Sequence, residues 1–144
     1  SDLTNSKVIG CDLTKCDLTK SNLTKCDLTK SNLTNVDVST CNISGCNMSG
    51  AILKGCKIPE IMKGVIIRGC NLEGYDMKGY ILEGCDLSGC NLTNSDLTNS
   101  KVIGCHLTKC DLTKSNLTNV DLTKSNLTNV DLSTCNISGC DMSG

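Results

Sequence analysis

Apolar and polar residues alternate along this chain in groups of five. The third residue of each group is Leu, Ile, Val or Met, and the first is small or apolar, most often Cys or Ser. The other positions are mainly polar, with Asp or Asn second and Ser or Thr fourth. Such alternation predicts a short strand with one buried face. A period of five residues fits neither the turn of a helix, about 3.6 residues, nor continuous alternation, so we expect a turn after every group.

The fifth residue of each group marks the expected turn. All thirteen Gly of the chain lie there, and most of the other groups end in Lys or Asn. Gly and Asn tolerate the positive φ that tight turns often require. We therefore expect a corner of the chain at every fifth position.

The five-residue frame is interrupted once. Eleven groups fill residues 1–55, the four-residue unit CKIP follows at 56–59, and the frame resumes at Glu60 and runs to the end. A second way of dividing the chain keeps CKIPE together and puts the short unit at 61–64. In both, one residue is missing near Pro59, and we expect local distortion there. Glu60 would be costly to bury at a first position.

The order small residue, Asp or Asn, Leu, Ser or Thr, then a variable residue resembles the signature of the pentapeptide-repeat family. The resemblance covers the whole chain. It implies an all-β fold, a right-handed quadrilateral parallel β-helix in which four groups make one coil and the third-position side chains fill the interior. Residues 1–144 would then form a single solenoid of about seven four-sided coils. The family commonly includes Phe at the third position, which this chain lacks.

The sequence also contains a longer repeat, made of many groups of five. Residues 1–50 and 95–144 are identical at 45 of 50 positions. Both ends of the sequence are in frame and lack the polar cap that solenoids use for solubility. These features favour a segment of a longer array or a subunit that stacks end to end, and an engineered concatenation also fits them.

Composition and charge argue against several classes of function. Fourteen basic and fifteen acidic residues give a net charge of −1, which predicts no direct binding to nucleic acid. No apolar run is long enough to span a membrane. Some pentapeptide-repeat proteins imitate duplex DNA and bind gyrase, but this chain departs from their acidity and from their Phe-rich ends.

No catalytic group of residues is apparent. The thirteen Cys follow the repeat, so we expect them to be reduced thiols packed in the first-position slot rather than metal ligands or disulfides. The single His106 replaces an Asp at an outward position, and the Asp residues are expected to bond to nearby turn amides. We predict no enzyme activity, cofactor, metal or small-molecule substrate. Buried thiols favour an intracellular protein slightly, and an extracellular fibre stays open.

The middle of the chain differs from its flanks. Ile occupies outward second positions there, and two Tyr fill first-position slots that are too small for them. Exposed apolar residues often mark contacts, although irregular packing around the frame interruption would also explain them. The predicted protein-contact patch consists of Ile61, Ile66, Arg68, Tyr75, Tyr80 and Ile81.

We predict a non-enzymatic structural rod that stacks end to end or belongs to a longer fibre, with a second copy as its most favoured partner. The alternative is a protein-binding module, including the gyrase-binding DNA mimic.

Overall fold

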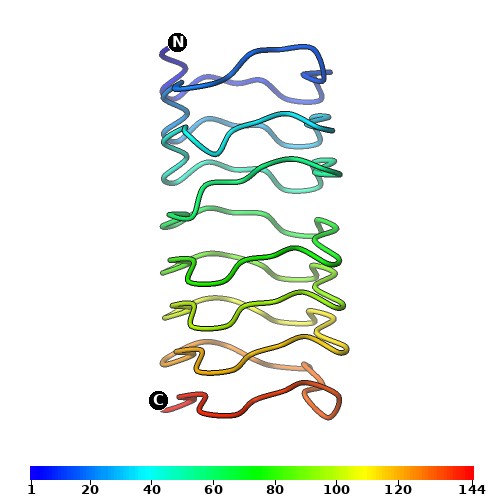
Figure 1. Ribbon diagram of the computed structural model, residues 1–144. Helices are drawn as coiled ribbons and strands as arrows, with labels where there is room; N and C mark the ends of the chain where they lie inside the picture. The colour runs from blue at the N-terminus through cyan, green and yellow to red at the C-terminus, as the bar shows by residue number, and fades with distance from the viewer.

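The computed structural model describes residues 1–144 as a right-handed four-sided parallel β-helix, as the sequence predicts (Figure 1). It contains no helix, and no strand is longer than a single bridge residue. Nearly every side of a coil contributes one such residue, always at the second position of its group, whereas Asp17 and Asp131 form no bridge. Parallel bridges join such a residue to the coils before and after, so one coil stacks on the next along the rod.

Bridges join second-position residues 20 apart through most of the rod, for example Asp2 to Asn22, and the one between Asn47 and Ile66 spans 19. We number the four sides by the first group on each. Side one runs through Asp2, Asn42, Ile61 and Ile81, side two through Lys7, Asn47, Ile66 and Asp86, side three through Asp12, Ile52, Asn71 and Asn91, and side four through Asp17, Asp37, Lys57, Asp76 and Asp96.

The fifth-position residues form the corners. All thirteen Gly have positive φ, and so do the Asn residues at this position, as expected. Six of the seven fifth-position Lys also have positive φ, for example Lys109 at 59°, whereas Lys15 does not. Side chains with a Cβ are unfavourable in this region, so the Lys corners carry strain that the Gly corners avoid.

Two corners depart from this geometry because their fifth residue is Thr. Thr40 and Thr134 do not adopt positive φ, since a β-branched side chain is a poor fit to the left-handed region. The Thr40 hydroxyl accepts a hydrogen bond from the amide of Lys20, and Thr134 does the same for Lys114. No bridge forms between Asp17 and the residue twenty positions later on side four. The bridge between Asp111 and Asp131 on side three is likewise absent, so a Thr corner accompanies an interrupted ladder at both places.

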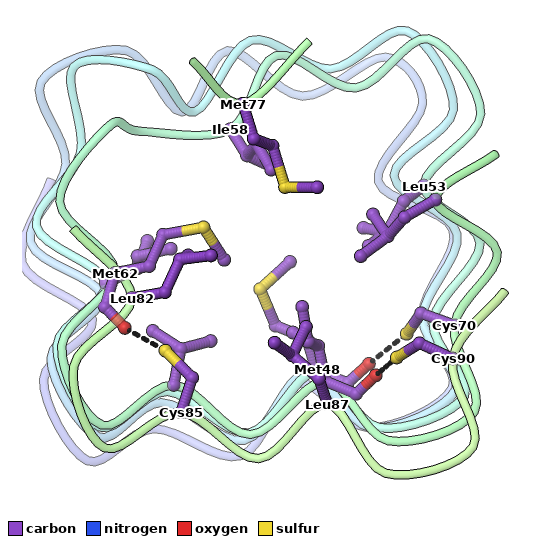
Figure 2. Close-up of a cluster of buried hydrophobic side chains, with 14 of the residues drawn as sticks. Met48, Leu53, Ile58, Met62, Cys70, Met77, Leu82, Cys85, Leu87 and Cys90 are labelled. Carbon is purple, nitrogen blue, oxygen red and sulfur yellow. Dashed lines mark hydrogen bonds between the residues drawn. The ribbon is translucent and has the colours of Figure 1, made fainter. Parts of the chain in front are cut away.

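The third-position side chains fill the interior. In Figure 2 they point inward from all four sides and meet near the axis of the rod. Leu23, Leu72 and Leu92 are completely buried. The core therefore extends the length of the rod as a stack of aliphatic side chains, with Met48, Met62 and Met77 in its middle.

Many of the first-position Cys and Ser share one hydrogen-bonding role. The Cys85 thiol donates to the carbonyl of Met62 over 2.7 Å, and the Ser115 hydroxyl donates to the carbonyl of Leu92 over 2.8 Å. In both pairs the acceptor is a third-position residue 23 positions earlier. All thirteen Cys are free thiols, and burial raises the pKa of Cys46 to about 12. Such a thiol keeps its proton at neutral pH and packs as a small apolar group.

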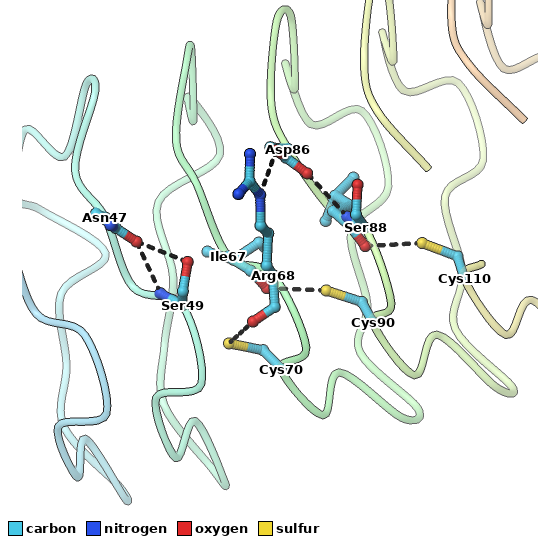
Figure 3. Close-up of polar contacts among 10 residues, drawn as sticks. Asn47, Ser49, Ile67, Arg68, Cys70, Asp86, Ser88, Cys90 and Cys110 are labelled. Atoms are coloured by element: carbon cyan, nitrogen blue, oxygen red, sulfur yellow. Dashed lines mark hydrogen bonds and ion pairs between the residues drawn. The ribbon is translucent and has the colours of Figure 1, made fainter. Parts of the chain in front are cut away.

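Outside the core, each second-position Asp or Asn forms a turn with the fourth residue of its group. The Asp2 carboxylate accepts from the Thr4 amide at 3.0 Å and from the Thr4 hydroxyl at 2.6 Å. Figure 3 shows the same arrangement between Asn47 and Ser49. The turn bonds that the sequence predicts for Asp are therefore present, and Asn makes them equally well.

Candidate functional site: the joint between the third and fourth coils

The four-residue unit shortens the third coil, residues 41–59, and creates a joint between it and the fourth coil, residues 60–79. The backbone shows which residue is missing. The Glu60 carbonyl accepts from the Ile81 amide at 2.8 Å, as the Tyr80 carbonyl accepts from the Lys101 amide. Glu60 thus occupies a first position in the backbone, and the unit ending at Pro59 lacks its fifth residue. The Glu60 side chain is exposed, which avoids the cost of burying its charge.

The joint interrupts the ladder on three of the four sides. No bridge connects Asn42 with Ile61, Ile52 with Asn71, or Lys57 with Asp76. Side two alone remains bridged, through Asn47 and Ile66. The backbone hydrogen bonds across the joint are Gly45 N to Lys63 O, Met48 N to Ile66 O, Gly50 N to Arg68 O and Ile66 N to Cys46 O. The next pair of coils is bonded on all four sides.

Two tyrosine hydroxyls reach across the joint. The Tyr75 hydroxyl donates at 2.5 Å to the Leu53 carbonyl and lies 2.8 Å from the Cys56 carbonyl, while the Tyr80 hydroxyl is 3.4 Å from the Ile58 carbonyl. The carbonyls of Leu53 and Ile58 belong to third-position residues, the class that accepts from Cys and Ser elsewhere. Tyr is a longer donor in the same slot, and it spans a wider separation of the coils. Burial raises the pKa of both phenols, so they remain protonated donors.

A groove follows the open sides of the joint. Its volume is about 1030 Å³, and its apolar lining includes Ile58, Pro59, Ile61, Tyr75 and Tyr80. A second, smaller hollow lies on side three between Ile52 and Asn71, where the bridge is also absent. Ile52 and Ile61 are among the most exposed large apolar side chains of the protein, at 53% and 57%. The joint therefore combines accessible apolar surface with open backbone.

Ion pairs connect the coils on either side of the joint but do not cross it. Lys57 pairs with Asp37 at 3.7 Å between the third coil and the second. Below the joint, Lys63 pairs with Glu83 at 3.0 Å and Arg68 with Asp86 at 2.5 Å. Lys78 lies 3.9 Å from Asp76 and 3.3 Å from Asp96. These contacts reinforce the two coils that border the opening.

Asp86 is the most buried of the carboxylates in these pairs. Burial by itself would raise its pKa, but hydrogen bonds from Ser88 and the contact with Arg68 outweigh burial and leave the pKa below its usual value. Figure 3 shows Asp86 between these two partners. The Arg68 side chain itself remains largely exposed, at 62%.

The structure divides the predicted contact patch. Ile61, Tyr75 and Tyr80 come together at the groove, although both phenol rings pack inward against the core. The half-buried Ile81 lies directly below Ile61 on side one. The half-buried Ile66 and the exposed Arg68 lie on side two, where the ladder is intact. Whether these residues contact a partner stays a prediction.

The other side chains that could bind a metal or take part in catalysis do not come together in the structure. No three His, Cys, Asp or Glu side chains are placed to hold a metal ion. His106 is exposed and lies in the ladder of side two between Asp86 and Asn126. The structure has no helix that is long and apolar enough to cross a membrane.

The sequence does not reveal the open backbone of side three at Ile52 and Asn71. The missing residue lies on side four, and its effect spreads to both neighbouring sides. The second-position Ile52, an apolar residue at an outward position, is the signal that could have identified it.

Comparison with known proteins identifies the repeat. The family model for pentapeptide repeats matches residues 1–35, 21–58, 70–108 and 105–144, and thus leaves out the segment from Pro59 to Gly69 at the joint. No protein of curated function matches the chain by sequence.

Solved structures of pentapeptide-repeat proteins are similar to this chain at low identity. HetL, a pentapeptide-repeat protein involved in heterocyst differentiation regulation from the cyanobacterium Nostoc sp. strain PCC 7120, has a TM-score of 0.51 and 15% identity, over 99% of this chain and 85% of its own. A trypsin-treated form of QnrB1, a plasmid-mediated fluoroquinolone resistance protein, has a TM-score of 0.47 and 19% identity, over 99% and 84%.

Proposed function

Because the chain belongs to the pentapeptide-repeat family, we propose that it is a non-catalytic structural β-helix whose rods associate with one another end to end. The observation that supports this best is the uniformity of the stacking contact. The same second-position bridges and the same first-position donors recur from coil to coil. A coil of a second copy offers the same groups, and open strand edges are templates for further strands.

The duplicated segments support a repetitive assembly. Asp2 lies on side one with Asn22, whereas Asp96, its counterpart in the second segment, lies on side four between Asp76 and Asn116. The two nearly identical surfaces are therefore presented at different heights of the rod and a quarter turn apart. A partner copy that contacts one of these surfaces finds the same surface again further along.

Electron microscopy over a range of protein concentrations tests the proposal. We expect rods whose length grows with concentration while their width stays constant. The matched control is Lys7→Pro, because the Lys7 amide makes no hydrogen bond within the chain and Pro removes that donor from the edge of the first coil. Short rods of a single length for the unmodified protein would contradict end-to-end association.

A protein-binding module is the second candidate, and the exposed apolar groove at the joint favours it. The gyrase-binding version of this function has less support, because Lys and Asp alternate over the surface and the net charge is only −1. A DNA supercoiling assay with purified gyrase tests that version, and inhibition by this protein would support it.

A further inference from the structure

The joint lacks one rung of the ladder on side four. Lys57 is bridged to Asp37 above it, and Asp76 is bridged to Asp96 below it, but nothing connects Lys57 with Asp76. In Figure 1 the front strands spread apart in the green middle of the rod, while the strands behind them keep a regular spacing. The groove occupies this opening, between Lys57 and Ile58 on one lip and Asp76 on the other.

Both lips carry backbone groups without partners. On the third coil, the amides of Leu53, Gly55 and Ile58 make no hydrogen bond, although the corresponding amides of the second coil all do. On the fourth coil, the amides of Asn71 and Asp76 and their carbonyls are likewise unpaired. Leu53 and Ile58 are buried residues, and buried backbone groups are nearly always bonded. Unpaired groups along both lips therefore leave donors and acceptors free to bond to a partner.

We propose that the joint binds an extended segment of a partner polypeptide, which enters the groove as the missing rung. Such a segment would accept hydrogen bonds from the amides of the third coil and donate to the carbonyls of the fourth, running parallel to both. A small molecule could not satisfy donors and acceptors spread over two sides. The required partner is thus a strand, and end-to-end association of rods is not needed for it.

The groove also specifies the side chains of the segment. Alternate residues of a strand point to opposite faces, and the inward face of this opening is bordered by Ile58 and the two Tyr rings, while the exposed Ile61 lies at its outer edge. Lys57, Glu60 and Asp76 line the outer rim with charges of both signs. We expect a segment with small or aliphatic residues at alternate positions and polar residues between them.

A phage-displayed library of random octapeptides tests the proposal. The library is first depleted on a closed-joint variant, in which Lys-Gly replaces Pro59 to restore the fifth residue and Tyr75→Cys and Tyr80→Cys restore small first-position donors. It is then selected on the unmodified protein. The best peptide is synthesised with a fluorescent label, and its affinity is measured by anisotropy.

The expected result is enrichment of peptides with alternating aliphatic residues. Methylation of alternate peptide amides should weaken binding at least about tenfold, because it removes strand donors. Ile61→Lys should weaken binding as strongly, whereas Ile9→Lys, at a similarly exposed Ile (51% against 57%) far from the joint, should not. Both positions are exposed, so these variants retain the fold.

Three outcomes would overturn the proposal. They are selection of no peptide beyond the closed-joint background, equal affinity for the unmodified protein and the closed-joint variant, and binding unaffected by methylation of the peptide amides. Circular dichroism of each variant establishes that it is folded before its affinity is compared.

Discussion

At a first position, one hydrogen bond determines how much a buried Ser contributes to stability. Ser115 and Ser100 are both almost fully buried, at 2% and 1% exposure. The Ser115 hydroxyl donates to the Leu92 carbonyl, whereas the Ser100 hydroxyl has no partner. The two positions therefore separate the contribution of the bond from that of the side-chain volume.

Replacing these two serines by alanine should have different effects. Ser115→Ala removes the bond to the Leu92 carbonyl, and the acceptor of the Ser95 hydroxyl at 3.5 Å, and should lower the free energy of unfolding by about 1 kcal/mol. Ser100→Ala removes a buried hydroxyl without a partner and should leave stability unchanged or raise it by up to about 1 kcal/mol. Urea denaturation measures both, and equal losses would contradict the assignment.

At the scale of the repeat, the corner determines how well each group turns. Lys109 has a φ of 59°, a conformation that Asn tolerates better than Lys does. Lys109→Asn should therefore raise the free energy of unfolding by about 1 kcal/mol. Lys15→Asn is the matched control, because Lys15 has no positive φ. Thermal melting compares them, and an equal gain at both positions would show that strain at the corner is not the cause.

The Asp turns make the repeat sensitive to acid. Hydrogen bonds from Thr29, Ser39 and Thr113 lower the pKa of Asp27, Asp37 and Asp111. A carboxyl group with a lowered pKa in the folded state stabilises the fold above its unfolded pKa of about 3.9, and this stabilisation is lost as pH falls further.

Melting temperature should accordingly fall between about pH 5 and pH 3. Replacing those three Asp by Asn should reduce the fall, since Asn22 already accepts the same turn bonds from Thr24 without titrating. A pH dependence that is unchanged by the triple replacement would contradict this role.

The sequence predicts most of the repeat and less of its irregularities. Third-position burial and the Gly and Asn corners follow from the pattern, because each depends on one residue and its neighbours. The positive φ of Lys109 does not follow, since stacking imposes it against the preference of the side chain. The sequence alone could have predicted the altered corner at Thr40, because β-branched residues disfavour positive φ.

The sequence predicts where the joint lies but not how the coils open there. A missing residue beside Pro59 is visible in the frame, whereas the opening of three sides depends on how coils that are far apart in sequence adjust to it. Tyr75 and Tyr80 were expected to distort the slot. Their hydroxyls reach the carbonyls of the preceding coil, a role that the sequence does not predict because it depends on the separation of the coils.

At the scale of the whole molecule, the rod consists of two regular stacks joined along side two. Backbone hydrogen bonds cross the joint only between residues 45–50 and 63–68. Everywhere else, neighbouring coils are bonded on at least three sides, apart from the short segment that ends the chain. The joint is accordingly the part of the rod where local opening should require the least free energy.

Amide hydrogen exchange measured by NMR tests this central claim most directly. Leu33, Val38, Leu53 and Ile58 all have buried side chains. The amides of Leu33 and Val38 donate to Ile52 and Lys57, while those of Leu53 and Ile58 donate to nothing. We predict slow exchange for the first pair and fast exchange for the second. Equal protection of all four amides would show that the ladder continues through the joint, and would contradict the account.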